Sequence, residues 1–257
     1  MADIGVSSCM MWNAQLEEMF RILYENGIDE MELWAQHFQH RRFSVEEYVK
    51  LSALYPIKSC VHSYSWDLNL ASMNEGIRQA SVEEVKKAVR LAYDIGAIEV
   101  TVHPGRETMK GDRQIYLDYM RESLKQIMDY AGQYHIDISL EIMEKIPKEI
   151  FTSLEEMEKV TQGFPCFYTL DVAHCDSVEE VRHILKSAVH LSKIHISNRK
   201  GNQLHTPLDK GDYDFTTLLK ELEAAEIPII IEGFDQDEKL SVLHENLEFI
   251  KKIGGKK

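Results

Sequence analysis

The sequence predicts a single (β/α)8 TIM barrel that spans residues 1–257. Eight short apolar runs alternate with segments of helical periodicity, and the connections between them are short. Regular alternation of strands and helices predicts a parallel sheet, and eight units predict a closed barrel. A length of 257 residues suits one such domain. No GxGxxG motif follows the first strand, which argues against a dinucleotide-binding fold.

The expected strands are runs of apolar and β-branched residues. They cover residues 4–7, 30–34, 57–62, 98–103, 136–141, 166–171, 191–196 and 229–232. Asn13 is expected to cap the first helix, which Gly27 ends. Four further helices are expected to begin at a Ser-x-x-Glu capping box. These boxes start at Ser44, Ser81, Ser153 and Ser177.

The composition narrows the classes of partner. The formal net charge of −14 argues against a nucleic-acid partner and against acidic membranes. The chain shows no signal peptide and no apolar run long enough to cross a bilayer, so we expect a cytoplasmic protein. The four cysteines lack CxxC spacing, and we expect reduced, packed thiols. Homo-oligomerisation stays open.

Seven of the apolar runs carry a residue of metal-ligand type at or next to their C-terminal end. These residues are Glu32, His62, His103, Glu141, Asp171, His195 and Glu232. In a β/α barrel the C-terminal ends of all strands meet at one face, where active sites form. The last four lie on consecutive strands, so we expect their side chains to converge.

The converging set predicts a metal site. Three clustered carboxylates cannot all stay ionised unless a cation compensates them. Three carboxylates with one imidazole suit a single Mn²⁺, Mg²⁺, Co²⁺ or Zn²⁺. His62 and His103 face the same mouth, either as further metal ligands or as substrate hydrogen-bonders. His174, on the loop after Asp171, is expected to contact substrate or metal, and Glu32 to be a hydrogen-bonder of the barrel mouth.

Sequence strings at the strand ends extend this pattern over nearly the whole chain. They are MELW, HSYSWDLNLAS, TVHPGR, SLE, TLDVAH, IHIS and IIEG. With LDVAH followed by HIS, the sequence resembles the xylose-isomerase-like barrel superfamily. That superfamily includes sugar and sugar-phosphate isomerases and epimerases, inosose-dehydratase-type proteins and endonuclease IV DNA-repair enzymes.

The isomerase and epimerase branch implies one divalent metal held by Glu141, Asp171, His195 and Glu232. In that branch Glu141 and Glu232 are also the catalytic pair. One removes a proton from the carbon beside a ketone and the other returns it, through an enediolate that the metal stabilises. His174 matches a substrate-oxygen contact. The family arginine falls on Gly201 in this chain, and Arg199 is the substitute that we expect.

The endonuclease branch implies three zinc ions instead. Its ligand sets are His62, His103 and Glu141, then Asp171, His195 and Glu232, then His174 with an Asp-x-His pair. His205 matches the histidine of that pair, whereas Gln203 stands at the aspartate position. The same scaffold would also suit a metal-dependent dehydratase or lyase, or a barrel that keeps the metal without catalysis.

The sequence therefore predicts a metal-dependent isomerase or epimerase of a sugar, sugar phosphate or related polyol. Its partner would be a small carbohydrate. Tryptophans that follow the early strands either wall the sugar pocket or pack in the core. The polar loop 198–214 could close over the substrate. The expected substrate contacts are His62, His103, His174, Arg199, Trp12 and Trp66.

Overall fold

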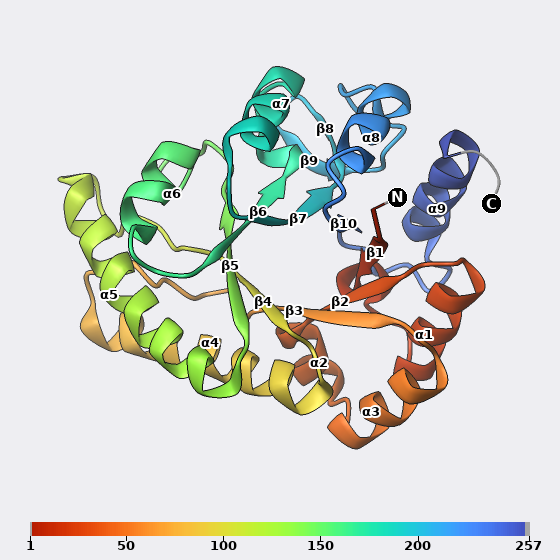
Figure 1. The fold of residues 1–257 in the computed structure, drawn as a ribbon, viewed down its shortest axis with the longest axis horizontal. Helices are drawn as coiled ribbons and strands as arrows, with labels where there is room; N and C mark the ends of the chain where they lie inside the picture. The colour runs from red at the N-terminus through yellow and green to blue at the C-terminus, as the bar shows by residue number, and fades with distance from the viewer. Residues whose placement is uncertain (1, 255–257) are drawn as a thin grey trace.

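Eight parallel strands close into a barrel with the helices in an outer ring, which confirms the predicted fold class (Figure 1). The structure is a computed structural model that describes residues 2–254. Around the barrel the strands are β1 (Ile4–Ser7), β2 (Glu30–Trp34), β3 (Lys58–His62), β4 (Glu99–Val102), β5 (Asp137–Ile142), β6 (Phe167–Asp171), β7 (Leu191–Ile196) and β10 (Ile229–Ile231), which pairs again with β1.

The helices lie between successive strands of the barrel. They are α1 (Leu16–Glu25), α2 (Ala35–Arg41), α3 (Val45–Leu54), α4 (Glu75–Ile95), α5 (Arg113–Ala131), α6 (Leu154–Thr161), α7 (Val178–Ser187), α8 (Phe215–Glu223) and α9 (Ser241–Ile253). Within residues 2–254, no helix has the length and hydropathy needed to span a membrane. The four cysteines are buried free thiols.

Period-two alternation along the strands separates an apolar layer from a polar interior. Successive side chains of a strand point to opposite faces. Leu33, Leu140 and Ile194 are fully buried in the hydrophobic cluster that the strands share with the helices. Their strand neighbours include Glu32, whose Oε1 lies 3.0 Å from Nζ of Lys193 across the barrel. The inward positions are therefore polar along much of the barrel's length.

Helix capping follows the sequence at three of the four predicted boxes. Ser44, Ser153 and Ser177 each accept the backbone N–H of the glutamate three residues later. The prediction at Ser81 is wrong, because Ser81 lies inside α4 and donates its hydroxyl to the carbonyl of Ile77. The helix begins earlier in the chain, at Glu75.

The actual caps of two helices differ from the prediction. Asn74 caps α4 by accepting the backbone N–H groups of Gly76 and Ile77. The expected cap at Asn13 is also wrong. Helix α1 begins after Gln15 with no side-chain cap, and Asn13 instead donates to the carbonyl of Gln236.

The polar loop 198–214 holds a short hairpin that the sequence pattern did not reveal. Strands β8 (Asn198–Lys200) and β9 (Gln203–Thr206) pair antiparallel, and Gly201 takes the left-handed conformation in the turn. The buried Asn198 side chain donates to the carbonyls of Leu208 and Tyr213 and fixes the base of the loop. This loop is thereby attached to the barrel mouth next to β7.

We predict that Asn74→Ala lowers the free energy of unfolding by about 1 kcal/mol, because the first turn of α4 loses its cap. Glu84→Ala, which would break the capping box predicted at Ser81, should change it by less than about 0.5 kcal/mol. Denaturant unfolding of both variants tests this. Equal losses in the two would contradict the observed helix start.

Candidate metal centre

The structure brings together the four side chains that the sequence predicts as one ligand set. Register places Asp171 beside His195, and His195 beside Ile230, two residues before Glu232. One potential ligand atom from each of the four residues lies within 4.8 Å of the others. The set is buried, with exposures of 1% for Glu141, 0% for Asp171 and His195, and 7% for Glu232.

The atoms of this set that could bind a metal face one another, and in the described chain they have no hydrogen-bond partners. Within residues 2–254, no partner satisfies the buried atoms Glu141 Oε2, Asp171 Oδ2, His195 Nδ1 and Glu232 Oε2. His195 Nδ1 lies 2.8 Å from Glu232 Oε2 and 3.6 Å from Glu141 Oε2, but without hydrogen-bond geometry. Unpaired buried polar atoms are costly, and a shared cation would satisfy all four at once. The residues therefore fit a divalent metal ion.

His62 and His103 extend the cluster on one side of Glu141. Their Nε2 atoms lie 3.4 Å and 3.3 Å from Glu141 Oε2. His62 Nδ1 contacts the carbonyl of Ser63 at 2.9 Å, so this nitrogen carries the proton in the neutral ring and leaves a lone pair on Nε2. Two acceptor atoms facing each other require a proton or a cation between them. The trio His62, His103 and Glu141 is a second potential ligand group.

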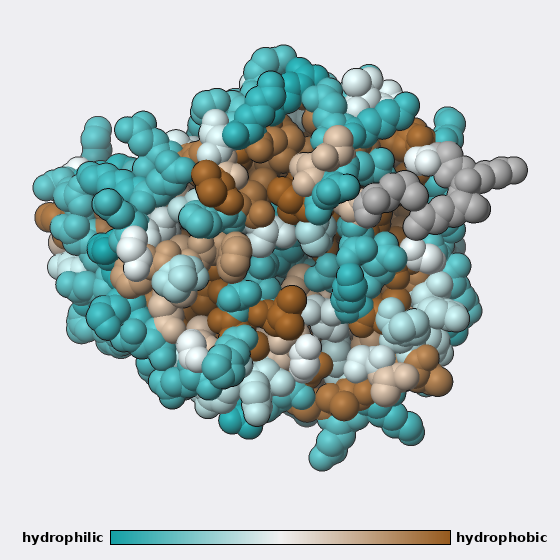
Figure 2. Space-filling model, in the orientation of Figure 1, coloured by the Kyte–Doolittle hydropathy of each residue, from teal (hydrophilic) through white to brown (hydrophobic). Residues whose placement is uncertain are grey.

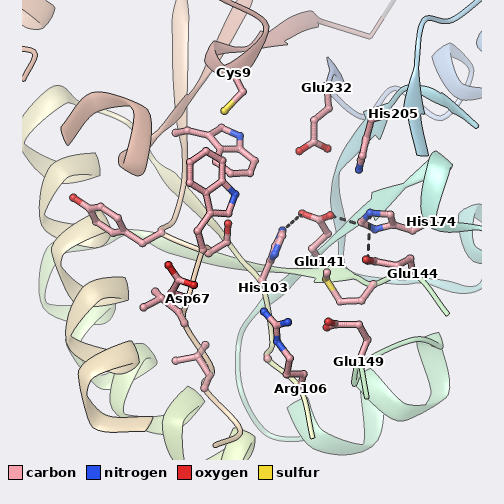
Figure 3. Close-up of a pocket in the computed structure, with 18 of the residues that line it drawn as sticks. Cys9, Asp67, His103, Arg106, Glu141, Glu144, Glu149, His174, His205 and Glu232 are labelled. Atoms are coloured by element: carbon pink, nitrogen blue, oxygen red, sulfur yellow. Dashed lines mark ion pairs between the residues drawn. The ribbon is translucent and has the colours of Figure 1, made fainter. Parts of the chain in front are cut away.

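A third potential group lies on the other side, around Asp171. His174 Nε2 lies 3.6 Å and His205 Nδ1 3.9 Å from Asp171 Oδ2. His205 sits on β9 in the left-handed backbone conformation, and its Nδ1 also lies 3.0 Å from the hydroxyl of Ser197. Figure 3 shows His103 and His174 flanking Glu141, with Glu232 and His205 approaching it from above. Gln203, at the other end of β9, is exposed.

The electrostatics of the cluster suit cation binding. Burial alone would raise the pKa of Glu232, but His195 beside it holds that pKa at about 2. Burial likewise opposes ionisation of Glu141, yet His103 and neighbouring histidines keep its pKa well below the usual range. Protonated histidines thus balance the carboxylates when no metal is bound. Metal uptake would displace these protons.

A cavity of about 640 Å³ opens above the cluster. Trp34, Trp66 and Phe234 form an aromatic side of it, and Trp34 stacks on His62 with the ring centres 4.0 Å apart. Arg106, Glu144 and Glu149 lie on another side (Figure 3). Figure 2 shows hydrophilic side chains over most of the viewed surface, with hydrophobic ones in patches between them. The cavity therefore joins apolar and charged walls.

Three predicted substrate contacts lie outside the residues that line the cavity, namely His62, Trp12 and Arg199. His62 is 0% exposed beneath the ring of Trp34, so its prediction as a substrate contact is wrong in this structure. The Trp12 ring is 6% exposed and stacks on His37, behind Trp66. Arg199 donates to the carbonyls of Cys175 and Gly201. These hydrogen bonds fix its guanidinium, and Arg199 is not among the residues that line the cavity. Of the described residues that line the cavity, Arg106 is the only arginine or lysine. Its position after the TVHPG string is the sequence signal that could have identified it.

Lys193 is a further residue of the site that the sequence pattern did not single out. This side chain is 2% exposed and lies inside the barrel beneath His195. The sequence feature that could have identified it is a lysine within the apolar strand LSKIHI, where a charged side chain is not expected unless it is paired.

The histidines predict a pH dependence for the metal-free protein. Burial alone would lower the pKa of His174, but the carboxylates of Asp171, Glu141 and Glu144 raise it to about 9. A pKa above the unfolded value stabilises the fold below about pH 6.5, and that stabilisation disappears as the pH rises through 9. His174→Gln should therefore flatten the loss of stability between pH 6.5 and 9, a loss on the order of 3 kcal/mol. Urea unfolding in the presence of a chelator measures it, and parallel profiles for both proteins would contradict the assignment.

Comparisons with known proteins agree with this fold. Over 229 aligned residues the chain is 28% identical to the uncharacterized protein MJ1188 of Methanocaldococcus jannaschii. The aligned region covers 86% of this chain and 84% of that protein. It is also 28% identical over 191 residues to a probable endonuclease 4 of Acholeplasma laidlawii, covering 64% of each.

A solved structure and a family model extend the comparison. The crystal structure of a D-tagatose 3-epimerase-like protein has the same fold, with a TM-score of 0.79, 23% identity, and coverage of 98% of this chain and 100% of that one. The family model described as xylose isomerase-like TIM barrel matches residues 20–253. This chain therefore belongs to the xylose isomerase-like TIM barrel family.

Proposed function

We propose that this protein is a divalent-metal-dependent isomerase or epimerase that acts on a sugar, a sugar phosphate or a related polyol. The observation that carries the proposal is the placement of two glutamates at one candidate metal position. Oxygens of Glu141 and Glu232 lie within 4.8 Å of each other, at the base of a cavity of about 640 Å³. A cavity of this size can take a small polyol.

The two carboxylates can serve as the acid/base pair. A divalent ion held by Glu141, Asp171, His195 and Glu232 would supply Lewis-acid polarisation of substrate oxygens. Each glutamate has two oxygens, so one can ligate while the other exchanges a proton. Glu141 comes from β5 and Glu232 directly follows β10, three strands away around the barrel. One can remove a proton from the carbon beside a ketone while the other returns it.

Neighbouring side chains would orient the substrate. His103 lies at the cavity wall beside Glu141, and His174 Nδ1 lies 3.4 Å from Glu141 Oε1. Both imidazoles can contact substrate hydroxyls. The rings of Trp66 and Phe234 are half exposed at the opening, and apolar faces of sugars stack well on such rings. The likeness in fold to the D-tagatose 3-epimerase-like protein supports the same reaction class.

Metal-dependent phosphodiester cleavage is the second candidate. The specific observation in its favour is the second ligand group, His62, His103 and Glu141, which shares Glu141 with the first. Closely spaced metals suit in-line displacement at phosphorus. The similarity to a probable endonuclease 4 points the same way.

The charge of the cavity favours the sugar substrate over DNA. The described lining includes five carboxylates and only Arg106 as a permanent cation. Those carboxylates are Asp67, Glu141, Glu144, Glu149 and Glu232. Phosphate backbones are bound mainly by lysines and arginines, so this wall would repel a nucleic acid. Bound metal would offset the charge of the ligands but not that of Asp67 or Glu149 at the rim.

The proposal predicts exchange of a carbon-bound hydrogen with solvent. Protein loaded with Mn²⁺ or Co²⁺ should incorporate deuterium from D₂O into a ketopentose, a ketohexose or one of their phosphates, as followed by proton NMR. Glu232→Gln should lower the exchange rate by about 10²-fold to 10⁴-fold, because one proton-transfer group is lost. Glu179→Gln, on the exposed face of α7, is the matched control and should retain the wild-type rate.

Two results would contradict the proposal. The first is an exchange rate in Glu232→Gln equal to that of the control. The second is no exchange with any ketose, together with zinc-dependent nicking of a duplex that contains an abasic site. That second result would assign the chain to the endonuclease branch.

A further inference from the structure

A buried ion pair lies directly beneath the candidate metal centre. Glu32 of β2 is 0% exposed and Lys193 of β7 is 2% exposed. Glu32 Oε1 is 3.0 Å from Lys193 Nζ and accepts the hydroxyl of Thr101 at 2.8 Å. Lys193 also donates to Glu99 Oε1 at 2.8 Å. Residues of the three strands β2, β4 and β7 therefore hold the pair in place inside the barrel.

The other oxygen of Glu32 faces a candidate metal ligand. Glu32 Oε2 lies 3.0 Å from His195 Nε2, and neither atom has a hydrogen-bond partner elsewhere in residues 2–254. The ring N–H is not fully aligned with that oxygen, as is common for site hydrogen bonds before a ligand binds. The opposite ring nitrogen, Nδ1, faces Glu232 and Glu141. One imidazole thus connects the ion pair to the ligand cluster.

Stability alone does not account for this arrangement. The interior layers of β/α barrels are typically filled by branched apolar side chains. Replacing a buried ion pair with apolar residues of similar volume is often neutral or stabilising. In this protein a glutamate and a lysine occupy the layer instead, and one oxygen of the glutamate faces the imidazole of His195. This arrangement indicates a role toward the metal. Carboxylates commonly hold the outer nitrogen of metal-bound histidines in this way.

We propose that Glu32 is a positioning residue that accepts the Nε2–H of His195 and so presents Nδ1 of that ring to the divalent ion. Lys193 and Thr101 hold the Glu32 carboxylate in place for this purpose through their contacts with its Oε1. The inference rests on the metal centre of the proposed function. It adds an ion pair that orients one ligand from inside the barrel.

The test compares variants of the buried layer. Glu32→Met combined with Lys193→Met removes both charges at similar volume and leaves His195 without its acceptor. Glu99→Gln is the matched control, because it changes the other partner of Lys193 and has no contact with His195. The readouts are the dissociation constant for Co²⁺ from chelator competition, the Co²⁺ absorption spectrum, and the His195 Nε2–H resonance in Zn²⁺-loaded protein.

The double variant should bind Co²⁺ about 10-fold to 100-fold more weakly than wild type, with an altered spectrum and no protected Nε2–H resonance. The control should bind within about threefold of wild type, because its ligand contacts are intact. Should the double variant not fold, Glu32→Gln carries the same comparison with Glu99→Gln, and a smaller loss of affinity is expected.

Wild-type affinity and spectrum in the double variant, or in Glu32→Gln if that replaces it, would overturn the role of Glu32 and leave the metal centre standing. Absence of Co²⁺ binding by the wild-type protein would overturn the metal centre itself, and the positioning role with it. Failure of the inference and failure of the proposed function are therefore distinguishable.

Discussion

Three carboxylates and an imidazole meet inside the barrel mouth, where water cannot screen their charges. Glu141, Asp171 and Glu232 are each at least nine-tenths buried, and one oxygen of each lacks a hydrogen-bond partner in the described chain. Such a group is tolerated only if protons or a cation lie between its members. The protonated histidines meet this need in the absence of metal. A divalent ion would meet it by taking one atom from each of the four side chains, and these atoms lie within 4.8 Å of one another.

The barrel explains why these residues converge. Parallel strands that close on themselves place all C-terminal ends at one face, and alternation turns every second side chain inward. Along β7 this rule places both Lys193 and His195 inside, in successive layers. The outer layer contains the candidate ligands, and the inner layer contains the ion pair that faces them. Burial of the apolar neighbours, such as Ile194, fixes the register of both layers.

The strands and the convergence of Glu141, Asp171, His195 and Glu232 could be predicted from the sequence because both depend on local pattern. Each predicted strand boundary lies within one residue of the observed one, since an apolar run begins and ends where burial does. The cap of α4 could not be placed in this way. Asn74 and Ser81 both resemble N-caps, and only the fold shows which one lies outside the helix.

Other features depend on tertiary contacts that no local pattern contains. The hairpin β8–β9 forms around the buried Asn198, whose partners are distant in the loop. Arg199 points to backbone carbonyls instead of the cavity, whereas Arg106 reaches the cavity from another loop. The partner of Glu32 across the barrel, Lys193, is separated from it by most of the chain. This last contact follows from closure of the barrel.

The most direct test of the metal centre is an anomalous-diffraction measurement on crystals of the protein soaked with Mn²⁺ or Co²⁺. We predict an anomalous peak in contact with Glu141, Asp171, His195 and Glu232. A map without a peak there, in crystals that show the four side chains ordered and the metal bound elsewhere or not at all, would contradict this prediction.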